Sequence, residues 1–276
     1  MAYKRILTIQ DISCIGQCSM TVAMPILSAC GHETCILPTA LLSTHTGGFG
    51  VPAVQQLSDT LPCIWRHWQR EGIAFDAIYT GYLGSVEAIR CADEIIDNLL
   101  APGGKSIVDP AMADHGKLYA GFDESYAREM KRLCEKADVM IPNITEAAMI
   151  TGLPYEENYD ERYITALMDA LGGKTVILTG VGYTPKETGA VIRTGEGTAC
   201  YQHARIGRNY HGTGDIFAAC LVGAWMQEMP FYDAVRIAAD FTCRCIENTN
   251  RDPAHWYGVK FETALPELIR MLELDK

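Results

Sequence analysis

Short runs of β-branched and aliphatic residues alternate with longer helix-like stretches along almost the whole chain, and this alternation limits the fold more than any other feature. Arg5–Ile9 is expected to form the first strand, and after a turn at Gly16 a helix is expected to reach about Cys30. Such repeats are typical of parallel strands joined by crossover helices. The sequence therefore predicts an α/β fold with a central, mainly parallel sheet and helices on both faces.

The same pattern continues to the end of the chain. Strands are also expected at Glu33–Leu37, Ala77–Tyr79, Ser106–Val108, Val139–Ile141 and Thr175–Thr179, and helices at Ser58–Glu71, Val86–Leu100, Ser125–Glu135, Thr145–Thr151, Arg162–Leu171, Thr213–Glu228, Tyr232–Asn248 and Phe261–Leu274. Pro38–Pro52, rich in Thr, Ser and Gly, is predicted to be irregular or a short flap, and Thr188–Arg193 with Gly197–Ala204 an antiparallel hairpin. No linker or repeat divides the chain, so residues 1–276 are expected to form one domain.

Composition argues against several classes of protein. The formal net charge is −11 and no basic cluster is longer than Lys4-Arg5, so no nucleic-acid partner is expected. No apolar run approaches the ~18 residues of a membrane span, and the apolar stretch at the start is too short for a signal peptide, which favours a cytoplasmic protein without a membrane partner. The 11 cysteines are then expected to stay reduced, and they contain no CxxC pair that would indicate zinc.

A Gly-Thr-Gly turn that opens directly into an apolar helix carries the strongest chemical signal. Gly212, Thr213 and Gly214 let backbone N–H groups converge at a helix N-terminus, where the helix dipole favours an anion such as a phosphate. Asp215 would lie in the first turn beside that anion. It can accept the proton of a substrate hydroxyl as the oxygen attacks phosphorus, or it can simply favour the helix dipole.

Two further segments place carboxylates at the ends of expected strands. Asp109 follows the strand that ends at Val108, and with Asp114 it could hold Mg²⁺, or the two could belong to an ordinary turn and loop. Asn143 and Glu146 form the pattern of a helix capping box, which is a sufficient structural reason for both residues. A functional role would place them near the same metal and phosphates.

Two loops carry hydroxyls, glycines and an aromatic ring. The segments LSTHTGG, which contains Thr46, and TGYLGS, which contains Tyr82, both follow strand-like runs. They could enclose a flat polar substrate against which Tyr82 packs, or they could be plain loops.

Taken together, GTGD before a helix, VDPAMAD, PNITE, LSTHTGG and TGYLGS occur in an order and spacing that resembles the pyridoxal kinases, a branch of the ribokinase-like superfamily. The resemblance covers nearly the whole chain. It implies an ATP-dependent kinase that phosphorylates the 5′-hydroxymethyl group of a vitamin B6 vitamer in the salvage of pyridoxal phosphate. The implied cofactors are ATP, Mg²⁺ and a monovalent cation such as K⁺, and the implied assembly is a homodimer.

The resemblance also implies roles for single residues. Asp215 would be the catalytic base, the Gly212–Gly214 turn would be the anion hole, and Asp109 and Glu146 would act on Mg²⁺ directly or through water. On the nucleotide side, the implied residues are Asp114 and Tyr119 in a loop over the ATP phosphates, Asn143 beside those phosphates, and Thr179 near the nucleotide. Thr46 and Tyr82 would contact the pyridine ring.

The chain departs from the family pattern after the first strand. Many pyridoxal kinases read Gln-Ser-His there, whereas this chain reads Gln10-Asp11-Ile12 and places a carboxylate where a substrate-contacting serine is expected. Asp11, with Ser13, is therefore a candidate substrate contact that favours a positively charged vitamer such as pyridoxamine. The alternative is that Asp11 turns to solvent or to the amides at Ser13 and Cys14. A smaller departure is Ile141 where many members carry threonine before Pro142-Asn143.

Two other functions stay open at this point. A hydroxymethylpyrimidine kinase of thiamin synthesis belongs to the same superfamily, but that branch usually has cysteine where this chain has Asp215. A non-catalytic ligand-binding protein on the same fold would not need the intact set of Asp109, Asn143, Glu146 and Asp215.

Overall fold

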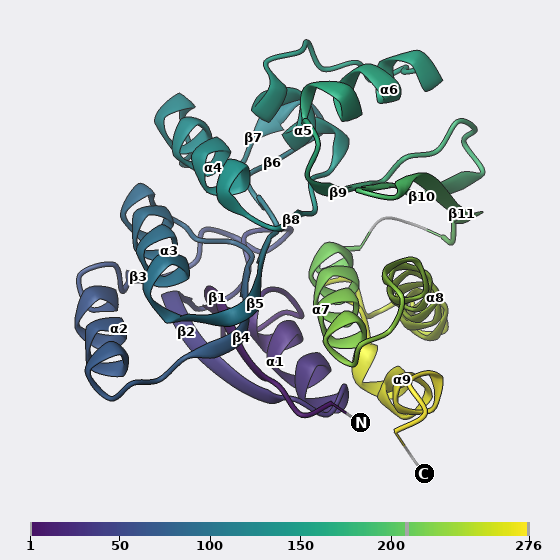
Figure 1. The fold of residues 1–276 in the computed structure, drawn as a ribbon. Helices are drawn as coiled ribbons and strands as arrows, with labels where there is room; N and C mark the ends of the chain where they lie inside the picture. Colours follow the sequence, from purple (N-terminus) through teal and green to yellow (C-terminus); the bar gives the residue numbers. More distant parts are fainter. Residues whose placement is uncertain (1, 208–209, 275–276) are drawn as a thin grey trace.

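The computed structural model describes residues 2–207 and 210–274, and a nine-stranded sheet runs through it in the order β11-β10-β9-β8-β5-β4-β1-β2-β3 (Figure 1). The strands of this sheet are β1 (Arg5–Ser13), β2 (Glu33–Leu42), β3 (Val54–Gln56), β4 (Phe75–Thr80), β5 (Leu100–Val108), β8 (Val139–Met140), β9 (Thr175–Thr179), β10 (Glu187–Thr194) and β11 (Gly197–Ala204). From β2 to β9 all neighbours are parallel, whereas β3, β10 and β11 pair antiparallel.

Helices cover both faces of the sheet, which confirms the predicted three-layer α/β fold. They are α1 (Met20–Ala29), α2 (Leu61–Arg70), α3 (Val86–Leu99), α4 (Glu124–Lys136), α5 (Ile144–Thr151), α6 (Glu161–Ala170), α7 (Thr213–Met226), α8 (Phe231–Asn250) and α9 (Leu265–Met271). Helices α2 to α6 pack on one face, and α1, α7, α8 and α9 on the other (Figure 1). Within the described part of the chain, no helix is both long and apolar enough to cross a membrane.

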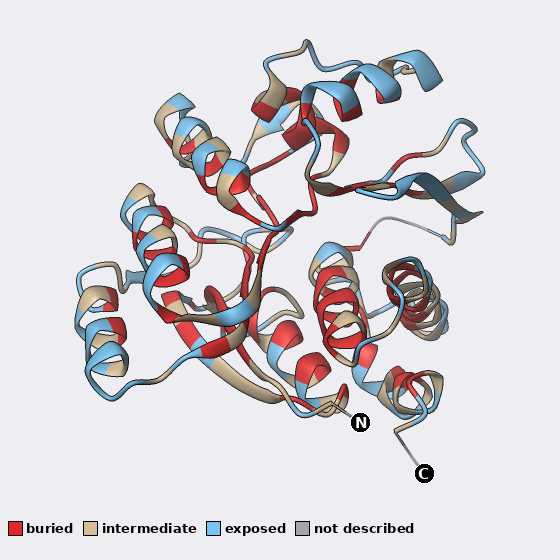
Figure 2. Cartoon of the chain, viewed as in Figure 1, coloured by how far each residue is buried: buried red, intermediate tan, exposed pale blue. Residues whose placement is uncertain are grey.

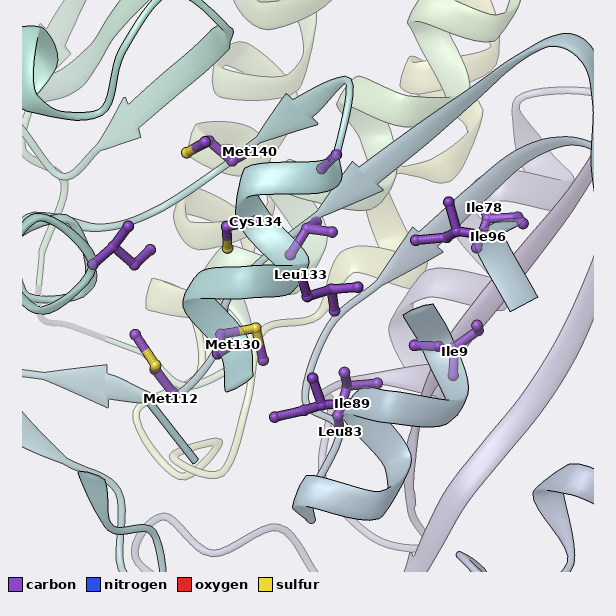
Figure 3. Packing of buried hydrophobic residues seen from close by; sticks show 14 of the residues in the cluster. Ile9, Ile78, Leu83, Ile89, Ile96, Met112, Met130, Leu133, Cys134 and Met140 are labelled. Atoms are coloured by element: carbon purple, nitrogen blue, oxygen red, sulfur yellow. The ribbon is translucent and has the colours of Figure 1, made fainter. Parts of the chain in front are cut away.

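Each face of the sheet has its own hydrophobic core, because successive side chains of a strand point to opposite faces. In β4, Ile78 packs under α2 to α6, whereas its neighbours Ala77 and Tyr79 pack under the other helices. Figure 2 shows buried residues on both sides of the central strands, and Figure 3 shows the first core from close by, with Ile78, Ile89 and Leu133. Strands buried on both faces read as continuous apolar runs, which is why the sequence revealed them.

The prediction that Pro38–Pro52 is irregular is partly wrong. Strand β2 continues through Pro38 to Leu42, and residues 54–56 form the short edge strand β3. Pro38 fits within a strand because β3 pairs with β2 only from Ala40 onward, so that Pro38 lies on an open edge where a missing N–H is tolerated.

Other boundaries also differ from expectation. Strand β5 begins at Leu100, directly after α3 and well before the expected Ser106, and the last helix is shorter, with a 3₁₀ turn η1 (Phe261–Ala264) before α9. The segment around Asp114, for which an ordinary loop was one of the alternatives, is a tight hairpin of β6 (Ala113–Asp114) and β7 (Lys117–Leu118). Its two turn residues, His115 and Gly116, have φ of 49° and 74°, the positive values that a two-residue hairpin turn requires.

Candidate active site

The sequence-predicted site residues gather at one edge of the sheet, because the parallel strands end side by side. Ile9 of β1 is in register with Thr80 of β4, Thr80 with Val108 of β5, and Val108 with Met140 of β8. The residues that follow these strands are therefore neighbours. Open α/β sheets bind ligands at this carboxyl edge.

The turn before α7 is shaped for an anion. Gly212 has φ of 81°, and a Cβ there would lie 1.9 Å from the carbonyl oxygen of Gln17. Around Gly214 the space is open, since a Cβ there would meet no heavy atom within 4 Å. The first backbone N–H groups of a helix have no carbonyl partner within it, so the N–H groups at Thr213 and Gly214 are available to a phosphate.

Asp215, at the third position of α7, is partly buried and has a raised pKa. Burial raises the pKa of its carboxyl group to about 7; a hydrogen bond from the Ser19 backbone N–H opposes this rise, and the charge of Asp11 adds to it. A carboxylate with a pKa near neutrality is suited to accept a proton in a reaction. It is half-buried, so it can still meet a substrate.

Asp109 and Glu146 form a pair of buried carboxylates, 9% and 2% exposed. Burial and then the charge of Glu146 raise the pKa of Asp109 well above its usual range, and burial raises that of Glu146 to about 7. A nearby cation would favour the charged form of both groups. Asp109 accepts one backbone N–H, from Ala111 at 3.2 Å, and its other oxygen has no hydrogen-bond partner among the described residues.

Glu146 is more fully occupied by the protein. Its Oε2 accepts the backbone N–H of Asn143 at 2.9 Å, and its Oε1 accepts that of Met112 at 3.0 Å. No group of three or more His, Cys, Asp or Glu side chains in the described chain is arranged to hold a metal ion. Mg²⁺ needs only one or two carboxylates when phosphates and waters complete its shell, so this pair fits Mg²⁺.

Asn143 and Thr179 sit beside this pair. The Asn143 side chain accepts the Glu146 backbone N–H at 3.0 Å and donates to the Ala113 carbonyl at 2.8 Å, so the predicted capping box is present. The Thr179 backbone N–H donates to the Pro142 carbonyl at 2.9 Å, which holds the end of β9 against the start of α5. Both residues therefore lie at the carboxyl edge of the sheet, and their role toward a nucleotide stays a prediction.

The β6–β7 hairpin projects over this region with Asp114 and Tyr119 exposed. It is attached to α5 because the Gly116 backbone N–H donates to the Thr145 hydroxyl at 3.1 Å. After the hairpin, the Tyr119 backbone N–H donates to the Met112 carbonyl at 2.8 Å. Exposed side chains on an attached hairpin are accessible to a ligand bound at the sheet edge.

On the other side of Asp215, Asp11 is only 2% exposed, which rules out the alternative that it turns to solvent. Its carboxylate accepts the hydroxyl of Ser13 at 3.0 Å, not the amides of the following turn. Burial raises the pKa of Asp11, and hydrogen bonds from Ser19 and Ser13 lower it. Tyr82 is close, since burial and then the charge of Asp11 raise the pKa of the Tyr82 phenol to about 12.

Thr46 is exposed on the segment after β2, and two histidines near it were given no role in the sequence-based prediction. His45 accepts the Gly47 backbone N–H at Nδ1 over 3.0 Å and contacts the Tyr257 carbonyl through Nε2 at 2.7 Å. Its ring lies 5.1 Å from that of His211, which precedes the anion-binding turn. The LSTHTGG segment contained His45, but nothing in the sequence indicated that the distant Tyr257 and His211 would lie beside it.

The site thus combines a helix N-terminus with open space for a phosphate, a carboxyl group whose pKa is near 7, and a pair of buried carboxylates at the edge of the sheet. This combination is that of a small-molecule kinase of the ribokinase-like fold. Residues 28–258 match the phosphomethylpyrimidine kinase family. The chain belongs to that family.

Solved structures and curated proteins with similar sequences include pyridoxal kinases. The crystal structure of pyridoxal kinase from Lactobacillus plantarum has 32% identity and a TM-score of 0.90, over 98% of each chain. A Bacteroides thetaiotaomicron protein named as a phosphomethylpyrimidine kinase, in a form with pyridoxal, has 32% identity and a TM-score of 0.86 over 96% of this chain and 95% of its own. Pyridoxal kinase of Arabidopsis thaliana is 28% identical over 241 residues, 82% of this chain and 75% of its own.

Proposed function

We propose that this kinase transfers the terminal phosphate of ATP to the 5′-hydroxymethyl group of a vitamin B6 vitamer: pyridoxal, pyridoxine or pyridoxamine. The observation that carries the proposal is that Asp215 lies in the first turn of α7, directly after the Gly212–Gly214 turn and next to the open space at Gly214. The charge of Asp11 raises the pKa of Asp215, and the charge of Asp215 raises the pKa of Asp109. The proposed base is therefore near both Asp11, a candidate vitamer contact, and Asp109, a candidate metal ligand, and it lies beside a helix N-terminus that is open to phosphate.

Asp215 would accept the proton of the substrate hydroxyl as its oxygen attacks the terminal phosphorus. The new P–O bond forms to the vitamer, the bond to the ADP oxygen breaks, and the carboxylate keeps the proton. N–H groups of the Gly212–Gly214 turn would face the charge that develops on the phosphoryl oxygens. Mg²⁺ would neutralise phosphate charge, with Asp109 as its direct ligand and Glu146 acting through water, because Glu146 already accepts backbone N–H groups through both oxygens.

The remaining nucleotide contacts follow from the same edge. Thr179 would lie along the nucleotide, and Asn143 would set the start of α5 beside the phosphates through its capping bonds. Asp114 and Tyr119 would cover the phosphates, which their exposure on the β6–β7 hairpin supports.

On the vitamer side we propose Thr46, Tyr82, Asp11 and Ser13 as contacts of the pyridine ring and its substituents. A buried carboxylate that faces a neutral ring is costly without a charged partner, and the neutral groups of Ser13, at 3.0 Å, and Ser19 offset only part of that cost. We therefore propose that Asp11 favours a vitamer that carries positive charge, above all pyridoxamine with its ammonium group.

A hydroxymethylpyrimidine kinase is the alternative to which the family name points. Asp215 argues against it, because the thiamin branch usually has cysteine at that position. A non-catalytic binding protein would not need the intact set of Asp109, Asn143, Glu146 and Asp215.

The test is ADP release by the purified protein with each vitamer and with hydroxymethylpyrimidine, in the presence and absence of Mg²⁺. Vitamer-dependent ADP release that requires Mg²⁺ is expected. Turnover of hydroxymethylpyrimidine alone would replace the proposed substrate, and binding without turnover of any substrate would indicate a non-catalytic protein.

We propose in addition that residues 1–276 act as one kinase domain in a cytoplasmic homodimer, with K⁺ as an additional cofactor. A nine-stranded sheet with β11 at one edge and β3 at the other joins the N- and C-terminal halves and supports one domain, and the 11 free cysteines suit a reducing compartment. Exposed apolar side chains at the β2–β3 edge, including Ile36, Leu41 and Val54, support a partner surface there. Light scattering after size-exclusion chromatography tests the dimer.

A further inference from the structure

An aromatic stack joins the β6–β7 segment to the vitamer side of the site. The ring of Phe122 lies 5.3 Å from that of Tyr82, centroid to centroid, with 28° between the ring planes. Phe122 also stacks on Tyr126 of α4, at 3.7 Å and 7°. Tyr126 is buried in the core beneath α4, so it gives Phe122 a fixed support.

Three hydrogen bonds connect the backbone before Phe122 to Glu146, one of the two carboxylates proposed to act on Mg²⁺. The Met112 N–H donates to Glu146 Oε1 at 3.0 Å, and the Met112 carbonyl accepts the Tyr119 N–H at 2.8 Å. The Phe122 N–H then donates to the Tyr119 carbonyl at 3.1 Å. Residues 112–122 therefore extend from a proposed metal-side carboxylate to a ring that contacts Tyr82.

Tyr82 is in turn hydrogen-bonded to Asp11 of β1, the residue that is proposed to select the vitamer. The Asp11 backbone N–H donates to the Tyr82 carbonyl at 3.1 Å, and the charge of Asp11 adds to burial in raising the Tyr82 pKa. A shift of Phe122 would therefore reach the residues that are proposed to hold the vitamer ring.

We propose that Phe122 is a positioning residue that couples nucleotide binding to vitamer binding. The inference rests on the proposed function. Asp114 of the β6–β7 hairpin and Tyr119 directly after it are exposed, and a nucleotide bound beneath them would add its contacts to the bond between Gly116 and Thr145 that already holds the hairpin. Phe122 would then be held against Tyr82, and the vitamer would bind to a ring that is already oriented. By linkage the vitamer must tighten nucleotide binding by the same factor.

A purely structural role is the competing explanation, since Phe122 also packs at the margin of the core. Loss of a core side chain lowers the stability of the protein and weakens the binding of each ligand independently. It does not change how much one ligand improves the affinity of the other. The coupling factor, the ratio of vitamer Kd without and with nucleotide, therefore separates the two explanations.

The test is isothermal titration of pyridoxamine into the full chain, without nucleotide and with saturating non-hydrolysable ATP analogue and Mg²⁺. In the wild type we expect the analogue to lower the pyridoxamine Kd by roughly 2- to 10-fold, the range that one aromatic pair can supply. Phe122→Leu should bring this factor close to 1. Phe122→Tyr keeps an aromatic ring against Tyr82 and should keep the wild-type factor. Phe231→Leu, which removes the edge-to-face contact of Phe231 with Trp225 on the other face of the sheet, is the matched control and should keep the factor.

A wild-type factor of 1, or the same factor in Phe122→Leu as in the wild type, overturns the inference. If the leucine variant does not fold, Phe122→Met replaces the ring by a flexible apolar side chain that can adapt to the space, and its factor decides. Turnover of a vitamer with no change in coupling would leave the proposed function standing and reject only the role of Phe122. Failure of the wild type to bind either ligand would overturn the proposed function as well.

Discussion

Gly212 and Gly214, two residues apart at the start of α7, are surrounded by the protein in opposite ways. A Cβ at Gly212 would lie 1.9 Å from the Gln17 carbonyl oxygen, whereas a Cβ at Gly214 would have no heavy atom within 4 Å. Only Gly212 has a positive φ, 81°. Gly212 is thus required by the fold, and the space beside Gly214 is left for a ligand.

Gly214→Ala should therefore fold normally and lose nucleotide affinity. Replacing glycine by alanine in a helix stabilises it by up to about 1 kcal/mol, so Tm should stay the same or rise. The added methyl group would enter the proposed phosphate space and raise the KM for ATP by about 10-fold or more, a cost of about 1.4 kcal/mol. Calorimetry and steady-state kinetics measure the two effects.

Gly212→Ala is the matched control for this prediction. Its Cβ meets backbone and its φ is unfavourable for alanine, so Tm should fall and activity should fall with it. A Gly214→Ala variant with unchanged KM for ATP would show that the open space does not hold phosphate.

Asp215→Asn should lower kcat by about 10²- to 10⁴-fold, the usual contribution of a general base, with little change in folding. In the wild type the base must be deprotonated to act, and its pKa is about 7. The rate should therefore be low under acidic conditions and rise with pH through about 7. A pH profile of kcat measures this limb.

Removing the charge of Asp11 provides an independent check on that profile. The charge of Asp11 contributes to the raised pKa of Asp215, so Asp11→Asn should shift the acidic limb of kcat to lower pH. Near-normal turnover in Asp215→Asn would show that the residue only favours the helix dipole.

The sequence was sufficient to predict that Asp109, Asn143 and Glu146 would lie together, because each follows or closely follows an apolar strand of a parallel sheet. Strand β3 carried no such signal, since Val54-Gln55-Gln56 is short and exposed. Contacts made by folding alone were also beyond prediction. Phe122 and Tyr82 are 40 positions apart and neither lies in a pattern that indicates the other, and the burial of Asp11 depends on elements that pack around it.

Removal of Mg²⁺ should abolish turnover, and Asp109→Asn should raise the Mg²⁺ concentration needed more than Glu146→Gln does. Asp109 is the proposed direct ligand, whereas Glu146 is occupied by the N–H groups of Met112 and Asn143. Titration of Mg²⁺ at saturating ATP and vitamer measures the difference, with Tm recorded for each variant. Unchanged metal dependence in both variants would make the two carboxylates structural.

The Asp109–Glu146 pair also predicts that the stability of the protein depends on pH, which can be measured without following turnover. The folded-state pKa of Glu146 is raised from 4.5 to about 7, so the folded protein binds more protons than the unfolded chain within that window. Stability of the metal-free protein should therefore fall as pH rises through it. Mg²⁺ with nucleotide should raise Tm more at pH 8 than at pH 5, and an equal rise at both would contradict a charged pair at the metal.

Asp11→Ser should change the preference among vitamers. The carboxylate is buried, lies near Tyr82 and Asp215, and has the hydroxyl of Ser13 as a partner. A charge-assisted hydrogen bond to the pyridoxamine ammonium would contribute roughly 1.5–3 kcal/mol, which corresponds to a preference of about 10- to 150-fold over pyridoxal. The measurement is kcat/KM for pyridoxamine, pyridoxine and pyridoxal in the wild type and the variant.

The wild type is expected to prefer pyridoxamine, and the Asp11→Ser enzyme to lose that preference while it keeps turnover of pyridoxal. Ser13→Ala is the informative companion, because it removes the hydroxyl that donates to Asp11 at 3.0 Å and leaves the charge in place. With one partner fewer, the carboxylate should depend more on the ligand ammonium, so the ratio of pyridoxamine to pyridoxal should stay the same or increase. If the ratio is the same in the wild type and in Asp11→Ser, the carboxylate serves the fold of the β1 end and does not select the vitamer.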